Sequence, residues 1–202
     1  MNVDLIYRIF VLILYIGLTT NRILFYRKEA MIENITVIKK DLLDQILSKI
    51  FGILWLTVLL VYVINSKLFS LFNINLPSYL RIVGLIPGLI ALILHFFSHK
   101  ALGKNFSPNI IIKKEQLLVT NGPYRYIRHP IYLSFFLFSI AFLLISSNWL
   151  VGMAWFLGMT ILSFLRIPRE EKMLEEEFGK KFIEYKNITG AFLPTHLLCK
   201  RK

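Results

Sequence analysis

Five long apolar segments, separated by loops that carry most of the charge, constrain the fold of this chain more than any other feature. They cover residues 5–20, 50–72, 80–97, 131–147 and 149–165. Such segments are typical of transmembrane helices, because a bilayer crossing needs about 20 predominantly apolar residues. With 56% hydrophobic residues and a mean hydropathy of +0.61, the chain is more apolar than ordinary soluble domains. The pattern predicts an all-α, polytopic membrane protein with five transmembrane helices in a single domain, residues 1–202.

Positive charge is concentrated in one set of loops. Apart from Arg8, Lys67 and Arg81, all of the 24 Lys and Arg residues lie in residues 22–49, 98–130 and 166–202. With five helices, these three regions share one side of the membrane, and the positive-inside rule makes that side cytoplasmic. The C-terminus is then cytoplasmic and the N-terminus lies outside. These loops explain the net charge of +12 without a nucleic-acid partner, because basic loops also contact anionic lipid.

The last two apolar segments are separated by only a few polar residues, which predicts a tight helical hairpin. The two outer ends of a hairpin lie on the same side of the membrane. The motifs at residues 128–132 and 166–171 are therefore predicted to be neighbours at the cytoplasmic face. Ionisable side chains at a membrane boundary are costly, so their placement there indicates a functional site.

A further helix is expected after the hairpin. Leu174, Phe178 and Phe182 recur at helical spacing within residues 169–187, and charged residues occupy the other positions. This pattern predicts a cytoplasmic amphipathic C-terminal helix that lies at the membrane interface.

The two motifs contain residue types that suit a charged ligand. Pro130 favours the first turn of a helix, so His129 is expected at the helix start and Tyr132 one turn further on. Arg166 and Glu170 are four residues apart and share a helix face. A site that combines a cation, a carboxylate and aromatic rings suits a zwitterion or a sulfonium, because aromatic faces attract soft cations.

The sequence of residues 118–132, Leu-Val-Thr-Asn-Gly-Pro-Tyr-Arg-Tyr-Ile-Arg-His-Pro-Ile-Tyr, resembles the cofactor motif of the isoprenylcysteine carboxyl methyltransferase family. Arg-Ile-Pro-Arg-Glu-Glu at residues 166–171 resembles the second block of that family. The resemblance covers about residues 75–195. It implies an integral membrane methyltransferase that uses S-adenosyl-L-methionine without a Rossmann fold, with its catalytic half at about residues 98–195.

The resemblance also implies roles for individual residues. The cofactor would contact Gln116, Leu117, Leu118, Val119, Tyr124, His129, Pro130, Ile131, Tyr132 and Glu170, with Ile131 contributing backbone only. Arg166 matches a substrate-binding residue, and Arg166 with Glu170 are the candidate catalytic residues. Gln116 departs from the family, whose members often have His there, and Asn109 is a further upstream candidate. No metal site is expected, because four His and one Cys show no ligand pattern.

The methyl acceptor is left open by the sequence, because side chains that contact a lipid tail resemble those that contact bulk lipid. The leading hypothesis is carboxyl O-methylation of an isoprenylcysteine-like or other lipophilic substrate that enters from the bilayer. A carboxylate is already ionised at pH 7 and needs no base. An amine would need one, with His129 or Glu170 as candidates. The alternatives are a phospholipid N-methyltransferase, an NADPH-dependent sterol-type reductase and a non-enzymatic lipid-binding protein.

Overall fold

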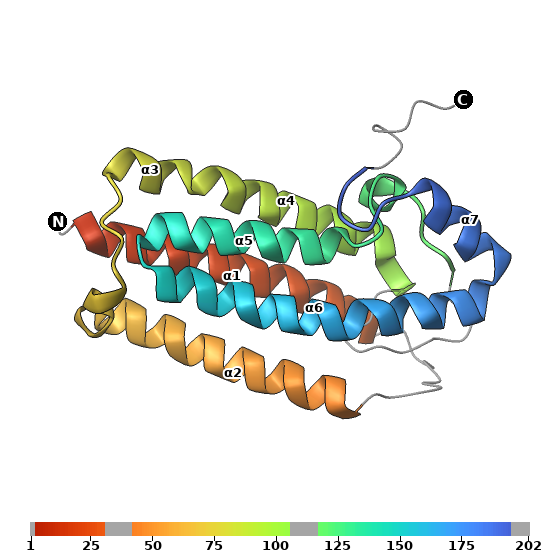
Figure 1. The fold of residues 1–202 in the computed structure, drawn as a ribbon, viewed down its shortest axis with the longest axis horizontal. Helices are drawn as coiled ribbons and strands as arrows, with labels where there is room; N and C mark the ends of the chain where they lie inside the picture. The colour runs from red at the N-terminus through yellow and green to blue at the C-terminus, as the bar shows by residue number, and fades with distance from the viewer. Residues whose placement is uncertain (1–2, 31–41, 106–116, 195–202) are drawn as a thin grey trace.

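The computed structural model describes residues 3–30, 42–105 and 117–194, and in these ranges the regular structure is helical, with no strand. Figure 1 shows the long helices side by side in one bundle, with α7 packed at one end. The elements are α1 (Val3–Ala30), α2 (Leu42–Ile64), the 3₁₀ helix η1 (Ser66–Phe72), α3 (Ser78–Val83), α4 (Leu85–Leu102), η2 (Gly103–Asn105), η3 (Gly122–Arg125), α5 (Pro130–Ser146), α6 (Trp149–Phe178) and α7 (Lys180–Ile188). The all-α prediction is confirmed over the described residues.

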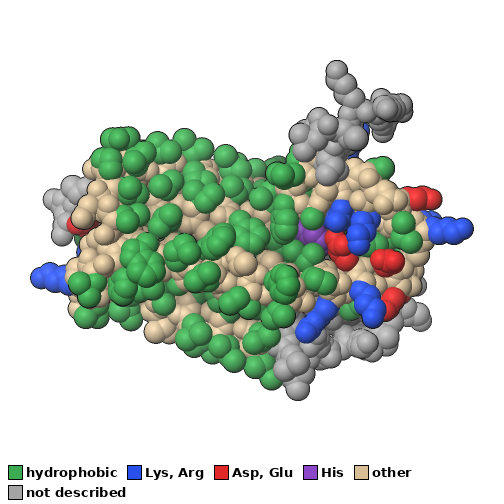
Figure 2. Space-filling model, viewed as in Figure 1, with side chains coloured by type: hydrophobic (Ala, Val, Ile, Leu, Met, Phe, Trp, Pro, Cys, Tyr) green, Lys and Arg blue, Asp and Glu red, His purple; other side chains and the backbone are tan. Residues whose placement is uncertain are grey.

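Four stretches of the described chain are long and apolar enough to cross a membrane. They are Asp4–Phe25, Gln45–Ile64, Ser78–Leu102 and Trp149–Phe178. The remaining predicted segment, residues 131–147, corresponds to α5, which is also apolar but has only 17 residues. Figure 2 shows hydrophobic side chains along most of the bundle on the face in view, as expected for helices that contact lipid.

The third apolar segment is divided where the sequence did not predict it. Pro87 and Gly88 lie within this segment, but the interruption lies at Gly84, between α3 and α4. Pro87 instead lies in the first turn of α4, where a missing backbone N–H is tolerated. Gly88 allows α4 to pack closely against α1, because a Cβ on Gly88 would lie 2.8 Å from Leu14 Cδ1 of α1.

The predicted separate helix over residues 169–187 is wrong in its boundaries. α6 continues without interruption to Phe178, with Pro168 inside it. The helix ends at Gly179, which adopts a φ of 52° that glycine tolerates well. At 1.5 Å per residue α6 is about 45 Å long, which exceeds a hydrocarbon core of about 30 Å. Most of the charged side chains visible in Figure 2 gather at this end, over the last part of α6 and α7.

The connection between α5 and α6 consists of Ser147 and Asn148. Ser147 adopts a left-handed conformation with φ of 52°, and the Asn148 side chain caps α6 by accepting from Val151 N–H. Asn148 Nδ2 also donates to the carbonyl of Phe69 at 2.9 Å, which attaches the turn to η1. The turn is thereby fixed, and it directs the first residues of α5 and the charged half of α6 to the same end of the bundle.

Candidate active site

A cavity of about 300 Å³ lies between α1, α2, α4, α5 and α6. Its polar lining residues include Tyr124, His129, Tyr132, Arg166 and Glu170. Its apolar lining residues include Phe51, Trp55, Phe135, Trp155, Met159 and Leu162. A mostly apolar pocket with a few convergent polar groups is typical of a small-molecule site.

The start of α5 places His129 beside the cavity. His129 is the N-cap residue, and Pro130 follows at the first helical position. The backbone N–H groups of Arg128 and His129 donate to the carbonyls of Gly190 and Ala191, at 2.8 and 3.0 Å. The segment after α7 therefore fixes the backbone just before α5, and His129 is buried with 5% exposure.

Tyr132, Glu170 and Arg166 form a connected polar group on the cavity wall. The Tyr132 hydroxyl donates to Glu170 Oε1 at 2.6 Å. Arg166 Nε lies 3.7 Å from the same oxygen, one helical turn earlier on α6. The two motifs thus meet in the structure, as the hairpin topology predicts.

Glu171 was not assigned a role by the sequence, yet its carboxylate contacts three basic side chains. Oε1 lies 3.0 Å from His129 Nε2 and accepts from Arg128 Nε at 3.0 Å, while Oε2 lies 2.9 Å from Lys186 Nζ. The hydrogen bond from His129, followed by those from Lys186 and Arg128, holds the pKa of Glu171 well below its usual range, although burial acts to raise it. The only signal in the sequence was its position beside Glu170.

Tyr124 is held in place by α7. Its carbonyl accepts a hydrogen bond from the Tyr185 hydroxyl of α7 at 2.6 Å, and its own side chain is buried against the cavity. Burial raises the pKa of Tyr185 to about 12, so this hydroxyl remains a donor at physiological pH. Tyr126, by contrast, is half exposed and does not line the cavity.

The predicted cofactor residues divide into two groups. Tyr124, His129, Ile131, Tyr132 and Glu170 line the cavity together with Arg166. Pro130 shapes the helix start without lining the cavity. Leu117, Leu118 and Val119 are described but are not among the lining residues; Leu117 is 61% exposed and its N–H donates to Asn105 Oδ1. Gln116 and Asn109 lie outside the described residues.

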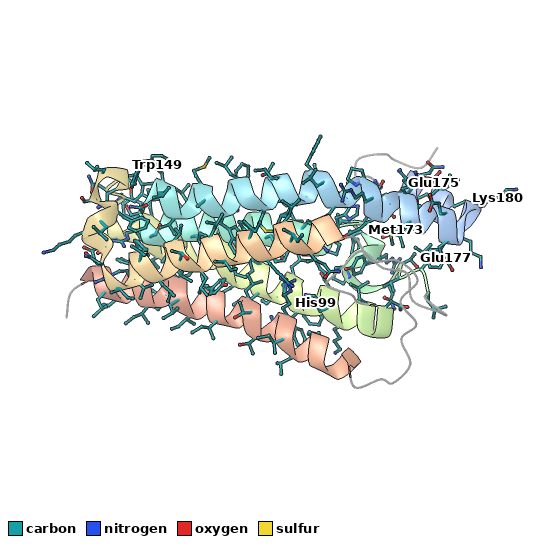
Figure 3. The ribbon with its side chains drawn as sticks, turned by 90° about the horizontal axis from the view of Figure 1, so that it is seen from below. His99, Trp149, Met173, Glu175, Glu177 and Lys180 are labelled. Carbon is teal, nitrogen blue, oxygen red and sulfur yellow. The ribbon has the colours of Figure 1, made fainter. Side chains whose placement is uncertain are left out.

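A second polar wall of the cavity was missed by the sequence analysis. His95 and His99 of α4 are buried, with their Nε2 atoms 3.1 Å apart, and both line the cavity together with Arg22 and Ser48. Figure 3 shows His99 inside the bundle, whereas Glu175, Glu177 and Lys180 lie at its charged end. The four-residue spacing of the two histidines was the available signal, because it places them on one helix face. Within the described ranges, no group of three His, Cys, Asp or Glu residues could hold a metal ion.

The apolar helical bundle and its mainly apolar cavity with a few convergent polar groups define a polytopic membrane protein with a candidate ligand site at one end. The model of the isoprenylcysteine carboxyl methyltransferase family matches residues 82–176, which include α4, α5 and most of α6. This part of the chain, slightly less than half of its length, is therefore similar to that family. The matched region contains His129, Tyr132, Arg166 and Glu170, so the resemblance inferred from the two motifs is confirmed.

Several curated proteins are similar to this chain. The protein-S-isoprenylcysteine O-methyltransferase of Saccharomyces cerevisiae is 38% identical over 94 residues, covering 46% of this chain and 39% of that protein. The human protein of the same name is 31% identical over 137 residues, covering 62% of this chain and 47% of that protein. The chain therefore spans less than half the length of these relatives.

A solved structure of a eukaryotic intramembrane Ras methyltransferase, isoprenylcysteine carboxyl methyltransferase, has a similar fold. The similarity covers 90% of this chain and 66% of that chain, with a TM-score of 0.55 and 22% sequence identity. This similarity extends the shared fold beyond the region that the family model matches.

Proposed function

We propose that this chain is an integral membrane methyltransferase that uses S-adenosyl-L-methionine to methylate the carboxylate of an isoprenylcysteine-like or other lipophilic acceptor. The similarity of residues 82–176 to the isoprenylcysteine carboxyl methyltransferase family supports the reaction class. One observation supports the site most strongly: Tyr132, Glu170 and Arg166 are in contact on the wall of a cavity that is otherwise mainly apolar and aromatic. An acceptor with a charged head group and an apolar tail requires a polar and an apolar environment side by side.

The cavity residues fit the cofactor chemically. S-adenosyl-L-methionine supplies a sulfonium methyl group when it is bound. Tyr124 and Tyr132 offer aromatic faces and Glu170 offers a carboxylate, all of which attract such a cation. His129, Pro130 and Ile131 would complete this side of the site, and Gln116, Leu117, Leu118 and Val119 remain expected contacts from the preceding loop.

Arg166 is the proposed acceptor-binding residue. Its guanidinium can hold a carboxylate by two parallel hydrogen bonds, which fixes the direction of the attacking oxygen. The carboxylate is ionised at pH 7, so no residue has to remove a proton. Glu170 orients both Arg166 and Tyr132, and the surrounding aromatic side chains exclude water from the reacting groups.

The proposed membrane arrangement has five spans, in which α5 crosses the membrane in addition to the four longer apolar stretches. Its 17 residues give a length of about 26 Å, which is short for a bilayer crossing but feasible beside longer helices. The distribution of Lys and Arg supports a cytoplasmic site and C-terminus, with the N-terminus outside. We treat residues 1–202 as one membrane domain, with the catalytic half at about residues 98–195 and α7 as the cytoplasmic amphipathic element. Membrane lipids surround it, and the acceptor enters from the bilayer.

Methyl transfer in detergent tests this function. Purified protein is incubated with S-adenosyl-L-methionine that carries a labelled methyl group, and with either N-acetyl-S-farnesylcysteine or phosphatidylethanolamine. The proposal predicts label in the prenylcysteine that mild base releases as methanol, because methyl esters hydrolyse and methylamines do not. Label that enters only phosphatidylethanolamine and resists base would contradict carboxyl methylation.

A further inference from the structure

Glu171 is the acidic side chain that connects α6 to the start of α5 and to α7. Its contacts with His129, Arg128 and Lys186 involve both carboxylate oxygens. The side chain is 13% exposed, and it is not among the residues that line the cavity. Glu171 therefore acts on the site through its neighbours, whereas Glu170 lines the cavity directly.

The contact with Glu171 determines which nitrogen of His129 can accept a hydrogen bond. A carboxylate only accepts, so the His129 Nε2 atom at 3.0 Å must carry the hydrogen. In a neutral imidazole, Nδ1 is then the atom with the lone pair. Arg128 and Lys186 already supply two positive charges to Glu171, so an imidazolium is not needed to balance the carboxylate.

We propose that Glu171 is a positioning residue that fixes the ring of His129 in the Nε2–H tautomer, so that Nδ1 accepts a hydrogen bond from an N–H or O–H group of the bound ligand. This inference rests on the proposed function, in which the ammonium group of the cofactor is a donor of this chemistry. A partner on the far nitrogen commonly orients a functional histidine in this way.

If Glu171 only held α7 in place, its variants should behave differently from variants of a residue that positions His129. Arg128 also donates to the carbonyls of Lys186 and Thr189, so Glu171 belongs to a network that holds α7 against α5. Holding α7 depends on the negative charge of the carboxylate, whereas positioning His129 depends on an oxygen acceptor near Nε2. Glutamine keeps one oxygen and loses the charge, while methionine loses both.

The test uses Lys186→Met as the background, because the new amide N–H groups of a glutamine would otherwise face the Lys186 ammonium. The affinity for S-adenosylhomocysteine is measured by calorimetry for Lys186→Met, Glu171→Gln/Lys186→Met and Glu171→Met/Lys186→Met. We expect the Gln double variant to bind within about threefold of the background and the Met double variant about tenfold more weakly. Glu175→Gln, an exposed position one turn along α6, is the matched control and should bind like the wild type.

Nitrogen-15 NMR of histidine-labelled protein gives a readout that does not depend on activity. The His129 resonances, assigned with His129→Asn, should show the Nε2–H tautomer in the wild type and in the Gln double variant, and a mixture in the Met double variant. Equal affinity in both double variants, or an unchanged tautomer in the Met variant, would overturn the positioning role. Failure of the wild type to bind S-adenosylhomocysteine would instead contradict the proposed function, and the tautomer measurement would still decide the role of Glu171.

Discussion

The Tyr132 hydroxyl donates a hydrogen bond to Glu170 at 2.6 Å, although the two residues are 38 positions apart in the chain. The contact crosses the cavity wall between α5 and α6 and places a phenol, a carboxylate and the nearby Arg166 in one group. It is the most direct connection between the two sequence motifs, and its removal tests whether they form one site.

Tyr132→Phe removes this hydrogen bond and keeps the aromatic ring. A hydrogen bond to a charged group contributes about 2 kcal/mol, so the affinity for S-adenosylhomocysteine should fall by roughly tenfold or more. Calorimetry in detergent measures the change. Tyr126→Phe is the matched control, because Tyr126 is half exposed and does not line the cavity. Equal losses in the two variants would argue against a specific role for Tyr132.

Arg166→Lys keeps the charge but removes the planar pair of donors. The Michaelis constant for a lipophilic carboxylate acceptor should rise by roughly tenfold, while the affinity for S-adenosylhomocysteine changes little, because a lysine cannot replace a bidentate arginine. Steady-state kinetics with varied acceptor measures this difference. Arg169→Lys, an exposed neighbour on α6, serves as the control. A large loss of cofactor affinity with no change for the acceptor would reverse the assignment.

The acid sensitivity of the fold should depend on Glu171. Its hydrogen bonds with His129, Lys186 and Arg128 lower its pKa in the folded state, so it stabilises the fold above the ordinary value of about 4.5, and this contribution is lost as the pH falls below that value. The melting temperature of Glu171→Gln should therefore be lower than that of the wild type at pH 7 and closer to it at pH 3.5. A difference that is independent of pH would show that the charge of Glu171 does not contribute.

Close packing between α5 and α6 should make Gly152 intolerant of larger residues. A Cβ at Gly152 would lie 2.5 Å from Leu143 Cβ and 2.8 Å from Leu143 Cα of α5. Gly152→Val should destabilise the protein by about 2 kcal/mol, as expected for overpacking. Gly52→Ala, where a Cβ meets nothing within 4 Å, should be nearly neutral. Thermal unfolding in detergent distinguishes the two, and equal melting temperatures would contradict the packing.

Much of this arrangement follows from the sequence, because a short connection between two apolar helices determines which of their ends meet. The Ser147–Asn148 turn is sufficient to place His129 and Tyr132 near Arg166 and Glu170. The continuation of α6 beyond Pro168 could not be predicted from the sequence. A proline removes one helical hydrogen bond, but the contacts of Glu170 and Glu171 with Tyr132, Arg128 and His129 hold the helix beyond it.

The role of Glu171 could not be predicted for a related reason. Its partner Lys186 comes from α7, whose position depends on the turn at Gly179 and on the pairing of Gly190 and Ala191 with the residues before α5. These are tertiary contacts that helical periodicity does not contain. The wall formed by His95 and His99 was accessible from their spacing alone, but its position at the cavity required the packing of α4 against α5.

The central claim is that Tyr132, Glu170 and their neighbours bind a sulfonium cofactor. The most direct measurement is a calorimetric titration of S-adenosyl-L-methionine, in the absence of an acceptor, into the wild type, Glu170→Ala and the exposed control Glu175→Ala. We predict saturable binding to the wild type and to Glu175→Ala, and loss of binding in Glu170→Ala. Absence of binding to the wild type, or binding of a nicotinamide nucleotide in its place, would contradict the claim.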